Sequence, residues 1–122
     1  MEKQGKSENV IVEKTYQFAI NAIEVYKNLV GNKREFILSK QFLRSATSIG
    51  ANVEEAIGAQ SKKDFIAKLS ISYKEAREVN YWIRLLRDSN FLETNNANEL
   101  LHDSEEILRI LTAILKSSKN KN

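Results

Sequence analysis

The sequence predicts an all-α protein, an antiparallel up-down-up-down four-helix bundle, and two observations lead to this prediction. The first is composition: proline is absent, glycine occurs 4 times, and 42% of the residues are hydrophobic, which suits long helices. The second is periodicity, because apolar residues recur at steps of three and four along four segments that short polar breaks separate. Amphipathic helices joined by short connections pack as antiparallel neighbours. The 122 residues are enough for one domain with one core.

The first helix is expected over residues 10–30, after a polar N-terminal arm, residues 1–9, that we expect to be disordered. Its main apolar row, which we expect to face the core, consists of Val12, Tyr16, Ala19, Ile23, Tyr26 and Val30. A second row runs beside it and makes the apolar side unusually wide: Phe18, Ala22, Val25 and Leu29. Gly31 and Asn32 tolerate the left-handed conformation and are expected to end the helix.

The second helix is expected over residues 36–57, and the stretch 44–56 in it organises the rest of the chain. The apolar positions on its core side are Phe42, Ala46, Ile49, Val53 and Ala56. On the adjoining side we expect Ser48, Asn52 and Glu55 to form a structural polar core, with Glu55 buried and paired to Arg44 or to an arginine of the third helix. Gly50 lies in mid-helix, where glycine costs about 1 kcal/mol relative to alanine, so we expect a packing reason for it.

The third and fourth helices are expected over residues 62–87 and 95–116. Ser61 followed by Asp64 resembles a capping box at the start of the third helix, and the segment 88–90 is expected to end it. Its heptad row is Phe65, Leu69, Ser72, Ala76, Val79, Ile83 and Leu86. The fourth helix continues the spacing with Ala97, Leu101, Ser104, Leu108, Leu111 and Leu115. The basic tail, residues 117–122, is expected to be disordered.

The net charge of +3 is small but unevenly distributed. Residues 33–87 carry a net charge of +5 and residues 88–109 a net charge of −5. This asymmetry fits an electropositive face for a polyanion, and it fits equally well helices that attract one another in an assembly. The chain has no cysteine, no secretory h-region and no apolar run long enough for a membrane span, so we expect a cytoplasmic protein that does not enter membranes.

Enzymatic chemistry finds little support in the sequence. Two pairs of glutamates resemble the paired carboxylates of general acid/base catalysis: Glu54 with Glu55, and Glu75 with Glu78. Structural ion pairs explain them more simply. Glu99 and His102 have the spacing of a di-iron ligand pair, yet the chain has 1 histidine and cannot supply the second pair. We therefore expect no catalytic residues, no metal site and no cofactor.

The best candidate for a binding surface is the third helix. Lys63, Ser70, Arg77 and Arg84 are spaced seven apart, with Lys74 and Tyr81 between them, so that cations and an aromatic ring share one helix side. Such a strip can follow a phosphate backbone, and an aromatic ring can stack on a base. The candidate nucleic-acid-binding residues are Lys40, Arg44, Lys63, Lys74, Arg77, Tyr81 and Arg84. The alternative is an ordinary solvated helix face.

A surplus of apolar residues predicts self-association. Val25, Leu29 and Phe18 in the first helix, with Trp82 and Ile66 in the third, exceed what one bundle side readily hides. A homo-oligomer follows from this pattern, and the alternative is a monomer with a wide core-facing side.

Three segments together resemble a known family: RSATSIGANVEEA at 44–56, SKKDF at 61–65 and EAREVNYWI at 75–83. They are similar to the four-helix-bundle proteins encoded in intervening sequences of bacterial 23S ribosomal RNA genes. The resemblance implies a four-helix bundle that assembles into a ring-like homopentamer, with no established enzymatic activity. A related branch comprises accessory proteins of diversity-generating retroelements, which are basic pentamers that bind nucleic acid and a reverse transcriptase.

Individual positions carry the resemblance. Arg44, Ser48, Asn52 and Glu55 match polar positions of the family's second helix, and Glu75 and Trp82 match positions of its third. The segment 54–58 departs from the family, whose members more often place glycine directly after the second glutamate.

Together these observations predict a non-catalytic, self-associating protein that binds RNA or acts as a scaffold. The alternative is a protein–protein adaptor, such as an accessory subunit of a nucleic-acid enzyme like a reverse transcriptase, without direct RNA contact.

Overall fold

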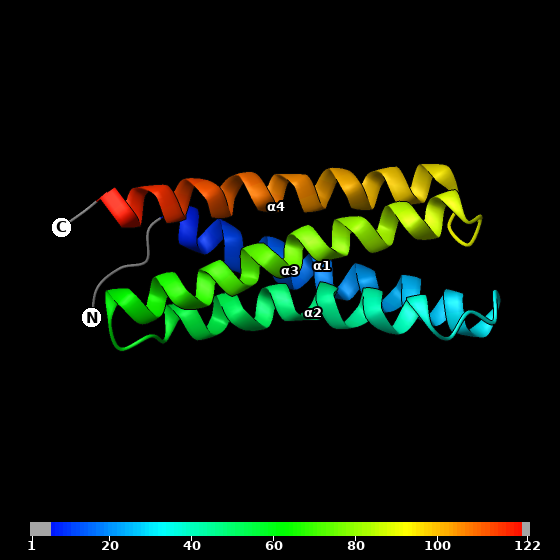
Figure 1. Ribbon diagram of the computed structural model, residues 1–122, viewed down its shortest axis with the longest axis horizontal. Helices are drawn as coiled ribbons and strands as arrows, with labels where there is room; N and C mark the ends of the chain where they lie inside the picture. The colour runs from blue at the N-terminus through cyan, green and yellow to red at the C-terminus, as the bar shows by residue number, and fades with distance from the viewer. Residues whose placement is uncertain (1–5, 121–122) are drawn as a thin grey trace.

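The computed structural model describes residues 6–120, with side chains from residue 9 onward, and it is a four-helix bundle. The helices are α1 (Lys6–Gly31), α2 (Leu38–Ile57), α3 (Lys62–Asp88) and α4 (Thr94–Asn120). They run alternately in opposite directions along one elongated bundle, in which α1 begins and α4 ends at the same end (Figure 1). Residues 6–120 contain no β-strand, and the predicted all-α, up-down-up-down fold is confirmed.

Each helix packs against the next one in the sequence, and α4 closes the bundle against α1. Consequently α1 and α3 occupy opposite corners, and α1 lies behind α3 in Figure 1. Over the described residues, none of the four helices combines the length and apolarity that crossing a membrane requires.

The core rows predicted for α2 and α3 are buried. All five apolar positions predicted for α2, from Phe42 to Ala56, are at most 1% exposed. In α3 the row from Leu69 to Leu86 is equally buried, and Phe65 at its start is partly buried. Phe18 of α1 and Phe42 of α2 are among the largest side chains in this common core.

The core row predicted for α1 was wrong. Tyr16 is 67% exposed and Ile23 is 37% exposed, whereas Phe18 from the second row is 2% exposed. The core residues of α1 are Ile11, Phe18, Ala22 and Leu29. Both rows keep the same helical spacing, so periodicity identifies them without showing which of them faces the interior.

A buried carboxylate fixes the start of α2, which lies at Leu38 rather than residue 36. Oε2 of Glu35 accepts hydrogen bonds from the backbone N–H of Ile37 (3.2 Å) and Leu38 (2.9 Å). Oε1 accepts one from the N–H of Ser39 (2.6 Å), whose hydroxyl donates to the Glu35 carbonyl (2.7 Å). Burial alone would raise the pKa of Glu35, but these donors outweigh it and hold the pKa below its usual value.

The conformations that end the helices differ partly from prediction. Gly31 and Asn32 do not adopt the left-handed conformation; Arg34, with φ of 56°, does. The backbone N–H of Glu35 then reaches back to the Leu29 carbonyl (2.9 Å), which closes the turn after α1 without a left-handed glycine. At the start of α3, Ser61 Oγ accepts from the Asp64 N–H (3.0 Å), as the capping motif predicted.

The helices also extend beyond the predicted arm and tail. Residues 6–9 begin α1 and residues 117–120 continue α4, although both segments were expected to be disordered. Neither segment contains the proline or glycine that interrupts a helix, and buried Ile11 and Leu115 anchor the adjoining turns. Residues 1–5 and 121–122 of the expected arm and tail lie outside the described residues.

Gly50 lies where α1 and α2 approach closely. A Cβ at this position would be 3.4 Å from both the carbonyl oxygen and the hydroxyl of Thr15 on α1. A contact of that length is ordinary, so the approach of the two helices limits side chains larger than alanine and does not by itself require glycine.

Candidate functional site

The outward side of α3 carries a row of cations, which we call the basic strip: Lys63, Lys74, Arg77 and Arg84, with Tyr81 among them. All five side chains are exposed, because their heptad spacing places them opposite the buried row of α3. Among residues 9–120, none of these four cations forms an ion pair with a carboxylate. The strip therefore keeps its positive charge in the folded protein.

Neutral groups hold the two arginines of the strip. Nη1 of Arg77 donates to the Tyr73 hydroxyl (3.4 Å), and Nε of Arg84 donates to Oδ1 of Asn80 (2.9 Å). The Arg84 guanidinium also lies 5.8 Å from the centroid of the Tyr81 ring. These residues line an open groove together with Glu78, whose carboxylate pairs with Arg44, and Leu108 forms the α4 side of the groove. Such partners orient a guanidinium without cancelling its charge, so both arginines can still bind an anion.

The two candidates on α2 differ from each other. Lys40 is exposed and, among residues 9–120, forms no ion pair. Arg44, in contrast, forms ion pairs with Glu78 through Nη2 and with Glu75 through Nη1 (3.2 Å), both on α3. The hydrogen bond to Glu78 is the main reason that the pKa of Arg44 is raised. Two carboxylates neutralise this cation, so the structure removes Arg44 from the set of free basic residues.

Trp82 completes the same α2–α3 contact. Its indole Nε1–H donates to Oε2 of Glu78 (2.9 Å), the oxygen that also meets Arg44. The Trp82 hydrogen bond, followed by the one from Arg44, lowers the pKa of Glu78 against the opposing effect of burial. Arg44, Glu75 and Trp82 match the family positions named above, and here they join two helices of one chain.

The predicted polar core is not in the interior, and this prediction was wrong. The side chain of Glu55 is 59% exposed and pairs with Lys68 (2.9 Å) rather than with an arginine. Ser48 donates to the Arg44 carbonyl (2.7 Å) and Asn52 to the Ser48 carbonyl (2.9 Å), so both bond their own helix at the bundle surface. A residue beside the apolar row of a helix can lie either in the core or at the edge of the contact between helices. The rotation of α2 about its own axis places Ser48, Asn52 and Glu55 at that edge.

Two buried polar residues, Ser72 and Ser104, are ones that the sequence places within apolar rows. Ser72 is fully buried, and its hydroxyl donates to the Ile49 carbonyl (2.8 Å) across the α2–α3 contact. Ser104 of α4 is also buried and accepts from Nδ2 of Asn80 (3.2 Å). Their positions in the heptad rows could have predicted this burial. A serine in a buried apolar row must form a hydrogen bond with the backbone or with a residue of another helix.

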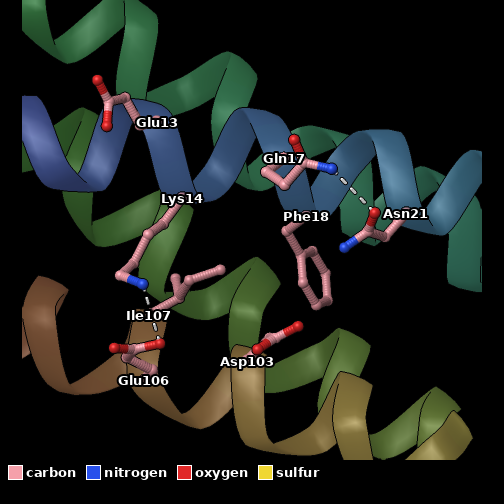
Figure 2. Close-up of a pocket in the computed structure, with 8 residues that line it drawn as sticks. All are labelled: Glu13, Lys14, Gln17, Phe18, Asn21, Asp103, Glu106 and Ile107. Carbon is pink, nitrogen blue, oxygen red and sulfur yellow. Dashed lines mark hydrogen bonds and ion pairs between the residues drawn. The ribbon is translucent and has the colours of Figure 1, made fainter.

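A second groove, between α1 and α4, is acidic (Figure 2). Its lining includes three carboxylates, those of Glu13, Asp103 and Glu106, and one cation, Lys14, which pairs with Glu106 (3.1 Å). Burial raises the pKa of Asp103. Phe18 and Ile107 also line this groove, as Figure 2 shows. The surplus of carboxylates makes the groove unsuited to a polyanion.

Metal-binding residues are not gathered in the described part of the chain. Over those residues, no group of three or more His, Asp or Glu side chains is placed to hold a metal ion. His102 is exposed on α4, beside Asp103 and Glu99 at an open surface.

The apolar residues expected to drive self-association lie mostly inside the monomer. Phe18 and Leu29 are buried, and Val25, Ile66 and Trp82 pack against the core. Phe36 (48% exposed), Ile37 (76%) and Ile71 (38%) reach the surface outside α1, and a further exposed apolar surface lies on the side of α1 that faces away from the bundle. It comprises Tyr16 (67% exposed), Ile20 (40%) and Ile23 (37%), and we call it the outer face of α1.

Comparisons with known proteins agree with this architecture. Residues 7–113 match a family model described as 23S rRNA-intervening sequence protein. A crystal structure of a protein of unknown function from the S23 ribosomal protein family, from Bacteroides thetaiotaomicron, is 44% identical and superposes with a TM-score of 0.89. The match covers 90% of this chain and 98% of that one. No curated protein matches the chain.

Proposed function

The chain belongs to the 23S rRNA-intervening sequence protein family, and on this premise we propose that it is a non-catalytic, self-associating cytoplasmic protein that binds RNA through the basic strip of α3. The observation that carries this proposal is the set of four exposed cations without carboxylate partners in the described part of the chain. A folded protein usually pairs or disperses its surface charge, whereas this strip concentrates one sign along a single helix.

The dimensions of the strip suit a nucleic-acid backbone. Lys63 and Arg84 are 21 positions apart, which corresponds to roughly 32 Å along a helix. Successive phosphates of one strand lie much closer together, so each cation can contact a phosphate of the same strand. The exposed ring of Tyr81, with Arg84 beside it, offers a surface on which an unpaired base can stack.

Self-association would bring several basic strips, one from each copy of the chain, into a single assembly. The outer face of α1 is an apolar surface that a second molecule can cover, and the family resemblance implies a ring of five copies. Several strips on one assembly would bind one RNA molecule far more tightly than a single strip does.

The alternative function is that of a protein–protein adaptor, for instance an accessory subunit of a reverse transcriptase. The same free cations would then meet carboxylates on an acidic partner protein, and RNA would not bind.

Retention of RNA by the immobilised full-length protein at low salt separates the two functions. Arg77→Glu with Arg84→Glu should abolish retention, because the pair converts the middle of the strip from positive to negative. Arg109→Glu with Lys116→Glu is the matched control, since both residues are exposed on α4 and the net charge changes equally. Unchanged retention in the strip variant would contradict the RNA proposal, and absence of retention by the wild type would favour the adaptor.

A further inference from the structure

The groove between α3 and α4 lies in the middle of the basic strip. Arg77 and Arg84 border it on α3, one heptad or roughly 10 Å apart along the helix, and Leu108 forms its α4 wall. Tyr81 lies between the two arginines in the sequence and also lines the groove. Exposed cations alone attract any polyanion, whereas the contacts inside this groove limit what can bind there.

A chain of three hydrogen bonds connects Arg84 to the interior of the bundle. The hydroxyl of Ser104, which is fully buried on α4, donates to the Leu101 carbonyl (2.9 Å). The Ser104 oxygen accepts from Nδ2 of Asn80 (3.2 Å), and Oδ1 of Asn80 accepts from Nε of Arg84 (2.9 Å). Because the hydroxyl proton is already used, the Asn80 amide directs its nitrogen to Ser104 and its oxygen to Arg84.

This chain orients the Arg84 guanidinium and leaves its anion-binding groups available. The Nε–H is engaged, but within residues 9–120 the two Nη groups of Arg84 have no hydrogen-bond partner. The Asn80 amide is uncharged, so the guanidinium also keeps its full charge. A planar guanidinium held in one orientation is well suited to bind a phosphate through two hydrogen bonds.

The ring of Tyr81 is also held in place. The Arg84 guanidinium lies over it, 5.8 Å from its centroid, and the Trp82 ring meets it edge to face, with centroids 5.1 Å apart. Trp82 is itself fixed by its hydrogen bond to Glu78 (2.9 Å). Tyr81 is nevertheless 48% exposed. The groove therefore presents a positioned aromatic surface beside a positioned cation, which lowers the entropy lost on binding.

One carboxylate also lines the groove, that of Glu78. Its Oε2 already binds Arg44 of α2 and the indole of Trp82. The charge of Arg44 offsets that of Glu78, so the groove takes its positive charge from Arg77 and Arg84.

We propose that this groove binds one unpaired nucleotide of RNA. The base stacks on the ring of Tyr81, and Arg77 and Arg84 bind the phosphates on either side of it. Asn80 and Ser104 are positioning residues, since they act by holding Arg84. The inference rests on the proposed RNA binding by the basic strip and adds a substrate class to it, which is single-stranded rather than duplex RNA.

The requirement for an unpaired base follows from the position of the ring. In a duplex each base is stacked between its neighbours, and neither face is open to a side chain. An unpaired nucleotide can turn its base toward Tyr81 while its phosphates stay on the arginines. The charge of the strip alone would instead favour a duplex, which carries twice as many phosphates as one strand of the same length.

Fluorescence anisotropy with a short unstructured RNA and a duplex of the same length tests the preference. The full-length wild type should bind the unpaired RNA about tenfold more tightly, because stacking of one base on an aromatic ring contributes about 1–3 kcal/mol. Tyr81→Ala should remove this preference, and Tyr81→Phe should retain it.

Phe36→Ala is the matched control for Tyr81→Ala. Phe36 is also 48% exposed and has the Arg34 guanidinium over its ring at 5.4 Å, but it lies outside the strip. Its replacement should leave the preference intact. Equal affinity of the wild type for both RNAs, or a preference that survives in Tyr81→Ala, would overturn the proposal and leave the strip standing. No binding of either RNA would reject the strip and the groove together.

A double-mutant cycle tests the positioning residues. Asn80→Leu should weaken binding of the unpaired RNA about fivefold when Arg84 is present and should have no effect in the Arg84→Ala background. Ser104→Ala, which removes one buried hydroxyl, should show the same dependence on Arg84 and serves if Asn80→Leu does not fold. A general loss of structure would weaken binding in both backgrounds. Additive effects of the substitutions would therefore overturn the assigned role of Asn80 and Ser104.

Discussion

Glu35 shows how one side chain can determine where a helix begins. Its carboxylate accepts hydrogen bonds from three successive backbone N–H groups at the start of α2, and the residue is only 9% exposed. These N–H groups have no partner within the helix, and they carry partial positive charge that favours an anion. The sequence did not reveal this role, because a glutamate three residues before a helix is not a common cap and it depends on the left-handed turn at Arg34.

Replacing Glu35 by alanine should therefore lower the free energy of unfolding by about 1–2 kcal/mol. The loss includes three hydrogen bonds and leaves the first N–H groups of α2 without acceptors. Glu93→Ala is the matched control, because Glu93 directly precedes α4 but is exposed, and its replacement should cost little. Urea denaturation followed by circular dichroism measures both values, and equal effects of the two changes would contradict this account.

Stability should also depend on pH through Glu35 and Glu78. Both carboxyls have a pKa lowered below the usual glutamate value in the folded protein, so the unfolded chain binds protons more readily. Their contribution to stability is present in full above that value and is lost as the pH falls through the lower folded pKa. We expect urea midpoints to be lower at pH 3.5 than at pH 6, with a smaller difference in Glu35→Gln. An unchanged pH dependence in that variant would exclude Glu35 as a source.

Prediction of the role of single residues succeeded where that role depends on local sequence, and it failed where the role depends on contacts with a neighbouring helix. Ser61 caps α3 as its sequence motif predicted, because the motif and its hydrogen bond lie within one turn. Arg44 was assigned to nucleic-acid binding, yet Glu75 and Glu78 neutralise it. That outcome depends on how α2 and α3 are rotated against each other, and the sequence of one helix does not contain it.

At the scale of the helix, α1 is the element whose prediction failed most instructively. The sequence correctly identified two apolar rows, but the row containing Tyr16 faces outward and the row containing Phe18 forms the core. Hydrophobic periodicity gives the number and spacing of the apolar faces of a helix. Which of two adjacent faces is buried depends on how α1 packs against α2 and α4. The error left one apolar face unexplained by the monomer, which is the surface now proposed to bind a second copy.

The approach of α1 to α2 at Gly50 leads to a prediction about side-chain size. Gly50→Ala should change the free energy of unfolding by less than about 1 kcal/mol, because its Cβ makes an ordinary contact with Thr15 while alanine favours the helix. Gly50→Val should be destabilising by about 1–3 kcal/mol, since its branched methyl groups reach further toward Thr15. Thermal unfolding of both variants gives the values, and equal stability of valine and alanine would mean that the helices are not closely packed here.

At the scale of the whole molecule, charge is separated between opposite regions of the bundle. The basic strip lies on α3, and the acidic groove lies between α1 and α4. The uneven charge of the sequence predicted this separation, and Lys63, Lys74, Arg77 and Arg84 were identified because heptad spacing alone places them on one side. Only the fold shows that, among the described residues, none of these four cations forms an ion pair with a carboxylate.

If the strip contacts RNA, affinity should fall steeply with salt. For single-stranded RNA the logarithm of the binding constant changes by about 0.7 per neutralised phosphate for each tenfold change in salt. Arg77→Ala with Arg84→Ala should therefore reduce the magnitude of that slope by about 1.4. Fluorescence anisotropy over a salt series measures it. An unchanged slope would mean that these arginines contact no phosphate.

The central claim is that the outer face of α1, though exposed in the single chain, is covered by another copy in solution. Light scattering coupled to gel filtration measures this most directly, because one chain has a mass of 14.0 kDa. We predict that the wild-type mass is several times that value and that Ile20→Asp lowers it. A wild-type mass equal to that of a single chain at micromolar concentration would contradict the claim.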